Sequence, residues 1–471
     1  MSFKRFISPY WILSIIVLFF FSFQYFFSST VPIGGDAASH VYSAKEILNL
    51  KRFFSVPYPL TEFLFSFSQI LPLSWEKRFI FWTCLGYLLA GITLGVNLKK
   101  ISGTAAASFG VIFWAISTWN ILPFYRDGTM PQLWSMIFLN FFIYFLIKKS
   151  KIGIIVALIL LKYSHPATFA VAVLALLLSW PYFFRIKLIL KNLIIIGETL
   201  GLILILMFFP NKFPYFDISA PGVFLSLESI SKSIILPAVI LSPIGLVLFL
   251  KTKQLGYTRY YLFAFSLLSF FLLFSHWLGT PNFERRFAPY GITMIIIFGS
   301  IGLNKILNSF TKKWIRITLS LLLLFPLAVN AGLTSREMYH EFEGGRKALH
   351  PEEKEAYIWM SKNIPADSLI LQTNERGRGA EWLRVYSERE NIFLTPPYVK
   401  MTLFSSCEEI IRNARLMHIT HIFFYQWAEK IPNVFNDNAN AFQIIYKNKF
   451  VTLFKLPDQN ITNLNQLCSR N

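Results

Sequence analysis

The sequence predicts a polytopic α-helical membrane protein of about eleven membrane segments, followed by a small C-terminal α/β domain. Three observations support this fold class. Of the 471 residues, 54% are hydrophobic and only 15% are charged, which is far from the balance of a soluble domain. Apolar runs long enough to cross about 30 Å of hydrocarbon recur up to residue 332. After them, helix-like and strand-like patterns alternate in a more polar segment.

Ten apolar stretches have the length of a membrane-spanning helix. They cover residues 9–29, 79–97, 104–122, 131–147, 166–184, 192–209, 233–250, 260–278, 288–303 and 315–332. An eleventh stretch, 152–164, is too short to span comfortably. It either dips into the membrane and returns or pairs with the next segment at Pro166, which breaks a continuous helix. The first stretch lacks a clean small-residue cleavage site, so we expect an uncleaved span.

Basic residues fall in alternate loops and predict the orientation of the chain. They are Lys4, Arg5, Lys99, Lys100 and the clusters within 148–151, 185–191, 251–259 and 305–314. Because cytoplasmic loops carry the excess of Lys and Arg, we expect these loops and the N-terminus inside. The first long loop, 30–78, and the C-terminal domain then lie outside the cytoplasmic membrane. These clusters account for the net charge of +20, so we expect no nucleic-acid partner.

The C-terminal part changes character, and we place the boundary between a transmembrane domain, 1–332, and an extracytoplasmic α/β domain, 333–471. Its patterns predict helices at 350–365 and 405–418, strands at 368–372 and 420–425, and a hairpin within 442–457 that turns at Lys447 and Asn448. Cys84 lies in a predicted span. Cys407 and Cys468 are therefore the plausible pair if this part faces an oxidising compartment, and two free thiols remain an equal alternative.

Asp36 is the leading candidate for a catalytic residue. It follows Gly34 and Gly35 just after the first span, where a carboxylate also suits the N-cap of the helix that the next residues predict. His40 follows four residues later, so both side chains can share one helix face and meet one proton or one cation. A carboxylate near the apolar boundary suits a general base.

Other polar residues occupy the outer ends of the predicted spans and indicate a cleft that opens outward. Arg126 and Asp127 lie in the second outer loop, and His165 lies between two apolar stretches, where it acts in the cleft or caps the broken helix. Arg285 and Arg286 precede a late span, at the level of an anionic headgroup, and guanidinium groups bind phosphate bidentately.

Glu198 lies within a predicted span between Gly197 and Gly201. A carboxylate at that depth suggests a functional group. Helix packing through the two small glycines, with the acid neutral or paired, is an equal alternative.

The whole pattern resembles the GT-C superfamily of integral-membrane glycosyltransferases. The residues that carry this resemblance are "GGDAASH" at 34–40, "RDGTMPQ" at 126–132, "SHPAT" at 164–168 and "ERRFAPY" at 284–290. The tail segment "YIWMSKNIPADSLIL" is similar to that of membrane proteins of the 6-pyruvoyl-tetrahydropterin-synthase-related type, although the metal-binding histidine pattern of the pterin enzyme is not visible.

The resemblance implies transfer of a sugar from a polyprenyl-phosphate carrier to a glycan, lipid or protein acceptor on the outer face, a role in the cell envelope. By this analogy Asp36 deprotonates the acceptor, and Arg285 or Arg286 holds the carrier phosphate. Asp36, His40 and His165 are the candidates for a divalent cation. The chain has one acid at the first-loop position where several members carry paired acids, which puts cation dependence in doubt.

Two other functions remain open from the sequence. A transporter or lipid flippase would use Glu198 as its coupling acid, although we find no matching halves with broken helices. A non-catalytic assembly protein would keep the scaffold and use the outer domain to bind partners.

Overall fold

The structure is a computed structural model, and it divides the chain into two compact units. The helical unit comprises Met1–Thr30 and Asn49–Gly344, and the α/β unit comprises Val31–Leu48 and Gly345–Asn471. The structure describes residues 8–29, 32, 36–47, 56, 58–117, 124–125, 129–185, 187–208, 236–273, 284–343, 349–373, 380–393, 406–425, 431–457 and 467–468.

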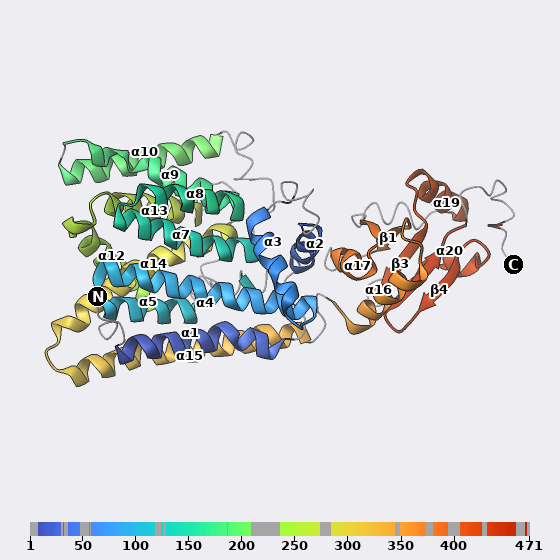
Figure 1. Ribbon diagram of the computed structural model, residues 1–471, viewed down its shortest axis with the longest axis horizontal. Helices are drawn as coiled ribbons and strands as arrows, with labels where there is room; N and C mark the ends of the chain where they lie inside the picture. Colours follow the sequence, from blue (N-terminus) through green and yellow to red (C-terminus); the bar gives the residue numbers. More distant parts are fainter. Residues whose placement is uncertain are drawn as a thin grey trace. The chain divides into compact units, whose positions relative to one another are not determined.

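The helical unit contains a helix at each of the eleven apolar stretches. These helices are α1 (Pro9–Ser28), α4 (Trp75–Ser102), α5 (Thr104–Ile116), α7 (Met130–Lys148), α8 (Lys151–Ser164), α9 (Pro166–Leu178), α10 (Leu188–Phe208), α12 (Leu236–Lys251), α13 (Tyr257–Leu273), α14 (Glu284–Ser309) and α15 (Lys313–Glu343). Figure 1 shows them running along a common direction. Two short elements of the first long loop, α3 (Pro59–Ser66) and the 3-10 helix Phe67–Ile70, also belong to this unit.

The chain is a membrane protein by the length and composition of these helices. Within the described ranges, six helical stretches are long and apolar enough to cross a bilayer: Pro9–Ser28, Trp75–Ser102, Met130–Lys148, Pro166–Phe183, Phe287–Ser309 and Trp314–Leu333. Three further apolar helices, α5, α12 and α13, are shorter. The count of about eleven crossings therefore stays a prediction, although the helices themselves are confirmed.

Local sequence signals set several helix boundaries. Gly103 separates α4 from α5 with φ of +91°, a conformation that favours glycine. His165 has extended dihedral angles between α8 and α9, and Pro166 begins α9 at a position where its missing N–H costs nothing. Gly245 lets α12 and α14 approach closely, because it has no side chain. A Cβ at this position would lie 1.8 Å from the Phe298 carbonyl oxygen.

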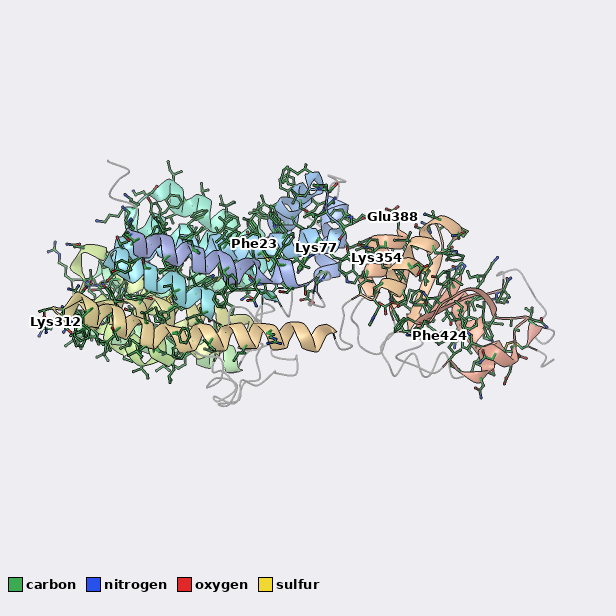
Figure 2. All side chains as sticks on the ribbon, turned by 90° about the horizontal axis from the view of Figure 1, so that it is seen from below. Phe23, Lys77, Lys312, Lys354, Glu388 and Phe424 are labelled. Atoms are coloured by element: carbon green, nitrogen blue, oxygen red, sulfur yellow. A yellow bond between two sulfur atoms is a disulfide. The ribbon has the colours of Figure 1, made fainter. Side chains whose placement is uncertain are left out.

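Lys77 closes the end of the first helix. Its Nζ donates hydrogen bonds to the carbonyl oxygens of Phe26 and Ser29, at 2.7 and 2.6 Å, and lies 4.8 Å from the centre of the Phe26 ring. Figure 2 labels this lysine. The carbonyl groups at a helix C-terminus lack intrahelical partners, and a cation satisfies them. Lys77 therefore holds the chain where it leaves α1 for the first long loop.

The α/β unit is built on one five-stranded sheet. Its elements are α16 (Pro351–Asn363), β1 (Leu369–Thr373), α17 (Ala380–Ser387), β2 (Glu390–Phe393), α19 (Cys407–Leu416), β3 (His421–Tyr425), α20 (Asn433–Asp437), β4 (Gln443–Lys447) and β5 (Val451–Lys455). The strand order is β2-β1-β3-β5-β4, with β2, β1 and β3 parallel and β5 antiparallel to its neighbours. The core cluster includes Phe424, which Figure 2 labels.

The expected elements of this unit are confirmed with small shifts, and three elements were not expected. The hairpin turns at residues 448–450, one residue later than predicted, because the Asn448 side chain accepts hydrogen bonds from the backbone N–H groups of Phe450 and Val451. Helices α17 and α20 and strand β2 were not expected. All three are eight residues long or shorter, too short for a clear periodic signal.

Cys407 and Cys468 form a disulfide with a Cα–Cα distance of 5.7 Å. It ties the first turn of α19 to the C-terminal segment, next to Ile410 and Ile411 of the core. Cys84 is a buried free thiol. The structure thus decides between the two alternatives that the sequence left open for these cysteines.

Candidate functional site

The first long loop supplies one group of candidate residues, on α2 (Ala37–Ile47) of the α/β unit. Asp36 precedes α2, and its backbone carbonyl accepts a hydrogen bond from the His40 N–H at 3.2 Å, as expected for an N-cap residue. The Asp36 side chain is exposed, whereas His40 is only 6% exposed. The helix therefore begins where the sequence predicted, and it leaves the candidate base open to an incoming group.

His40 lies on the buried face of α2. Ala37, Val41, Ala44 and Ile47 share this face, with exposures of 1% or less. Their spacing of three and four residues matches the period of an α-helix. His40 is therefore part of the packed side of α2, four residues from Asp36 in sequence but in a different environment.

The junction of α8 and α9 supplies a second group, in the helical unit. His165 caps α9, because its Nδ1 accepts a hydrogen bond from the Thr168 N–H at 3.3 Å. The Thr168 hydroxyl lies 2.8 Å from the same nitrogen and 2.6 Å from the hydroxyl of Tyr290. It also lies 2.7 Å from the Ser135 hydroxyl of α7. We call these four residues the junction cluster.

The hydroxyl of Thr168 lies within hydrogen-bond distance of three side chains, and its single proton can serve only one of them. A hydroxyl carries one donor and two acceptor positions, and here it has three side-chain partners. Ser135 also lies 2.6 Å from the carbonyl oxygen of Gln132, to which it donates. Thr168 and Tyr290 are fully buried, so the polar groups of the junction cluster satisfy one another away from solvent.

The second half of the first loop packs against this junction. Tyr58 stacks on the His165 ring, with 5.6 Å between ring centres, and the Thr61 hydroxyl lies 3.4 Å from the Ser164 carbonyl oxygen. Tyr58 precedes α3. The first loop therefore contributes one helix, α2, to the α/β unit and another, α3, to the helical unit.

The arginines lie in the first turn of α14. Arg286 is four residues before Tyr290. The backbone of α14 therefore places Arg286 one helical turn before the Tyr290 of the junction cluster. Arg126 and Asp127 lie outside the described residues.

Glu198 lies in α10 and is partly exposed. Its Oε1 accepts a hydrogen bond from the Trp180 indole N–H at 2.5 Å. In the part of the chain that the structure describes, its Oε2 has no hydrogen-bond partner, and no atom lies within 4 Å of a Cβ built on Gly197 or Gly201. Helix packing through these glycines, which the sequence suggested, is not seen among those residues.

The candidate cation ligands do not form a metal centre within the described ranges. No group of three His, Cys, Asp or Glu side chains there could hold a metal ion. Asp36 and His40 belong to the α/β unit and His165 to the helical unit. His165 Nδ1 already accepts from a backbone N–H, which leaves that nitrogen poorly suited to a metal.

Sequence reasoning missed Tyr290, Thr168 and Lys45. Tyr290 is four residues after Arg286, and Thr168 is three residues after His165, so both share a helix turn with a residue that was singled out. Their partners lie 122 and 33 residues away in sequence, and no local pattern predicts such pairs. Lys45 looked like an ordinary charge near the end of a helix.

The comparisons with known proteins concern the fold. No protein-family model matches the chain, and no curated protein matches it in sequence. Among solved structures, the oligosaccharyltransferase AglB from Archaeoglobus fulgidus, in complex with an inhibitory peptide and a dolichol-phosphate, is similar with a TM-score of 0.61. Its identity is 12%, over 98% of this chain and 76% of that chain.

Two further structures have the same fold. The Archaeoglobus fulgidus oligosaccharyltransferase in complex with Zn and sulfate gives a TM-score of 0.60 at 12% identity, over 96% of this chain and 74% of that chain. ArnT from Cupriavidus metallidurans, bound to undecaprenyl phosphate, gives a TM-score of 0.53 at 10% identity, over 98% of this chain and 99% of that chain. The expected resemblance is thus confirmed at the level of fold: this chain has the fold of the GT-C membrane glycosyltransferases.

Proposed function

We propose that this protein transfers a sugar from a polyprenyl-phosphate-linked donor to an acceptor at the outer face of the cytoplasmic membrane. One observation carries the proposal: the GT-C fold extends over 98% of the chain in proteins of two kinds, AglB and ArnT, whose structures contain dolichol-phosphate and undecaprenyl phosphate. A lipid-linked donor must be reached from within the bilayer, so a helical body combined with an exposed polar loop suits this chemistry.

In this proposal Asp36 is the general base. Its carboxylate takes the proton of the acceptor O–H or N–H group, and the freed electron pair forms the new bond to the anomeric carbon of the sugar. The bond from that carbon to the carrier phosphate breaks, and the phosphate leaves with the electron pair. The exposed side chain of Asp36 supports this role, because a base must come within hydrogen-bond reach of the proton that it removes.

The leaving phosphate needs positive charge and hydrogen-bond donors. Arg285 and Arg286 supply guanidinium groups at the start of α14, and Arg126 and Asp127 are further substrate-binding candidates from the second outer loop. The junction cluster supports this assignment, since it fixes Tyr290, one turn beyond Arg286, against His165. His165 then serves the site by positioning α14 and α9.

The same proposal covers the acceptor, the side of the membrane on which the reaction occurs, and a divalent cation. The acceptor is a glycan, a lipid or a protein, and the α/β unit faces the outside together with the first loop. The disulfide of Cys407 and Cys468 supports an extracytoplasmic location of the α/β unit, because disulfides persist in oxidising compartments. A divalent cation stays a candidate partner, and chelation during the assay below tests it.

Replacement of Asp36 by Asn tests the proposed base. Membranes that contain the full-length protein are incubated with tritiated undecaprenyl-phosphate monosaccharides, and transfer of label to endogenous acceptors is measured. We expect Asp36→Asn to lower kcat by about a hundredfold or more, the usual contribution of a general base. Glu46→Gln removes one negative charge from α2, ten residues beyond Asp36 in sequence, and should keep transfer within about twofold because it lies away from the reacting groups.

The outcome also separates the rival functions. Unchanged transfer in Asp36→Asn, together with loss of function in Glu198→Gln, would overturn the transferase proposal and favour a transporter that uses the Glu198 carboxylate of α10. Absence of transfer in the unmodified protein with every sugar tested, together with normal binding to envelope partners, would favour an assembly protein.

A further inference from the structure

The helix that follows Asp36 is held by the C-terminal part of the chain. Helix α2 packs on α17, more than 330 residues later in sequence, and both belong to the α/β unit. The buried residues of α2 meet a helix whose Trp382, Leu383 and Val385 are each at most 1% exposed. Figure 1 shows α2 beside α17. Both helices therefore carry buried apolar residues, and Lys45 of α2 adds a polar contact at the C-terminal end of α17.

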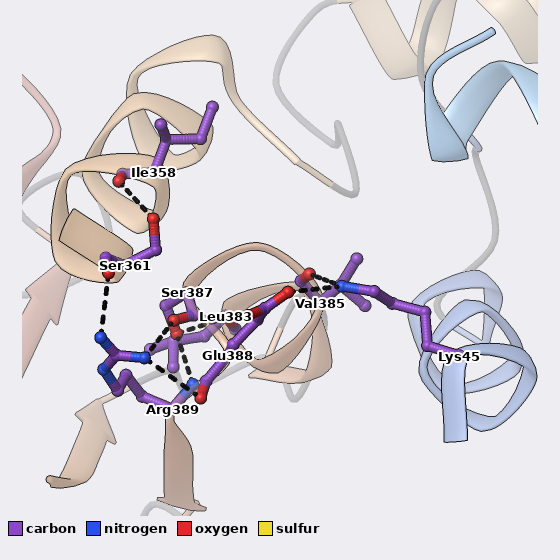
Figure 3. A network of polar contacts seen from close by, with 8 residues as sticks. All are labelled: Lys45, Ile358, Ser361, Leu383, Val385, Ser387, Glu388 and Arg389. Carbon is purple, nitrogen blue, oxygen red and sulfur yellow. Dashed lines mark hydrogen bonds and ion pairs between the residues drawn. The ribbon is translucent and has the colours of Figure 1, made fainter. Parts of the chain in front are cut away.

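Lys45 makes the principal polar contact between these two helices. Its Nζ donates a hydrogen bond to the carbonyl oxygen of Val385 at 2.7 Å and lies 3.4 Å from Glu388 Oε1 (Figure 3). Val385 belongs to the last turn of α17, where carbonyl groups lack intrahelical partners and the helix dipole is negative. The lysine side chain is 28% exposed and Glu388 is 71% exposed. The carbonyl contact is therefore the stronger part, since exposed ion pairs contribute little.

Arg389 fixes the same end of α17 to the body of the domain. Its guanidinium donates to the carbonyl oxygens of Ser361 and Ile364 at the end of α16, at 2.9 and 2.6 Å, and to that of Ser387 at 3.1 Å. Figure 3 shows the contacts with Ser361 and Ser387 together with that of Lys45. Glu388, between them, has φ of +56° and turns the chain away from α17.

A second cation contact lies along the helix pair. The Arg384 guanidinium lies 5.5 Å from the centre of the Tyr42 ring of α2, and the same arginine donates to the carbonyl oxygen of Asn391 in β2 and contacts Glu390. Three cations thus join the elements of this unit. Lys45 and Arg389 bind helix ends, and Arg384 contacts β2 and the Tyr42 ring.

We propose that Lys45 is a positioning residue: by seating α2 on the C-terminal end of α17, it lets the α/β unit fix the N-terminus of α2 and with it Asp36. This inference rests on the proposed function, because it concerns where the proposed base is held. On this inference, the C-terminal segment of the α/β unit, residues 345–471, supports the transfer step by holding Asp36 in place. No residue of that segment needs to touch the sugar. Lys45 itself touches neither donor nor acceptor.

Two readouts on the full-length protein test this inference. Hydrogen exchange measures how firmly α2 is held, and transfer from tritiated undecaprenyl-phosphate monosaccharides measures kcat and KM. We expect Lys45→Met to speed exchange of the α2 amides about tenfold, the effect of one charge-assisted hydrogen bond. We expect kcat to fall by a similar factor while KM for the donor stays unchanged, because the base is displaced and the donor site is not.

Three matched variants define the contact. Lys45→Arg keeps a cation that can reach the Val385 carbonyl and should restore both readouts. Glu388→Gln removes only the exposed ion-pair partner and should change neither by more than about twofold. Lys354→Met removes a cation that lies 4.7 Å from the Tyr386 ring of α17 on the α16 side, and it should leave α2 unaffected.

The outcomes distinguish the two proposals. Unchanged exchange of α2 in Lys45→Met would overturn the positioning role whatever happens to transfer. Faster exchange with unchanged kcat, in a protein that Asp36→Asn inactivates, would show that docking does not position the base. If Asp36→Asn retains full transfer, Asp36 is not the base, and the positioning role fails even if Lys45→Met loosens α2. Exchange of the amides in β1 and β3 serves as the check that each variant is folded.

Discussion

The junction cluster of the helical unit and the helix-end contacts of the α/β unit satisfy polar groups in opposite ways. In the junction cluster, neutral hydroxyl groups and one imidazole bond to one another, and all are at most 8% exposed. In the α/β unit, Lys45 and Arg389 bring charged groups to carbonyl oxygens at the ends of α17 and α16. A charge needs solvent or a partner, so the second arrangement lies closer to the surface.

This difference shows what each unit can do. Hydrogen bonds among neutral groups join the starts of α9 and α14, near the positions proposed for the phosphate site. The cationic contacts join segments that are far apart in sequence, and they can be altered singly without opening an apolar core. In the proposed function, the helical unit supplies the scaffold for the phosphate site, and the α/β unit holds the loop segment that carries Asp36.

The largest effect on stability is expected from the disulfide. Replacing Cys407 and Cys468 by Ser should lower the free energy of unfolding of the α/β unit by about 4 kcal/mol, because the bond closes a loop of 61 residues. Limited proteolysis of the full-length protein in increasing urea measures this change. A reducing agent should weaken the native protein and leave the double variant unchanged. Equal sensitivity of the two proteins would contradict the prediction.

A smaller loss is expected in the junction cluster. Thr168→Val keeps the shape of the side chain but leaves Tyr290, Ser135 and His165 without their shared partner, which should cost about 2 to 3 kcal/mol. Thermal unfolding in detergent checks this. Thr199→Val is the control, because the Thr199 hydroxyl donates to the carbonyl oxygen of Ile195 in its own helix. Equal melting temperatures for both variants would show that the junction cluster adds nothing.

The smallest effect is a pH dependence in the α/β unit. Burial on β3, with a contribution from Lys455, lowers the pKa of His421 to about 4. The unfolded chain, with a His pKa of about 6.5, binds the proton more readily. His421 therefore leaves stability intact above pH 6.5 and lowers it as the pH falls towards 4, by on the order of 1 to 2 kcal/mol. Urea proteolysis between these pH values measures the loss.

Two histidine variants sharpen this last prediction. His421→Gln should flatten the dependence, since it removes the titrating group. His418→Gln should not, because His418 is exposed. A pH dependence that survives in His421→Gln would assign it to another group.

Much of the fold could be predicted because its signals are local. Each apolar stretch became a helix, and Gly103 and Pro166 ended or began helices where their backbone chemistry requires. The site was only partly predictable. The helix after Asp36 and the helix cap at His165 follow from residues three or four positions apart. The pairing of Thr168 with Tyr290 does not, because 122 residues separate them.

The sequence by itself determined that this is a membrane protein with a helical body and a small α/β part, since hydrocarbon demands long apolar helices and the strand patterns are short and periodic. Only the tertiary structure decided that the first loop is shared between the two units, that Cys407 pairs with Cys468, and that Lys45 binds the end of α17. These contacts join residues from 61 to 340 positions apart, and their energies depend on packing that no local pattern encodes.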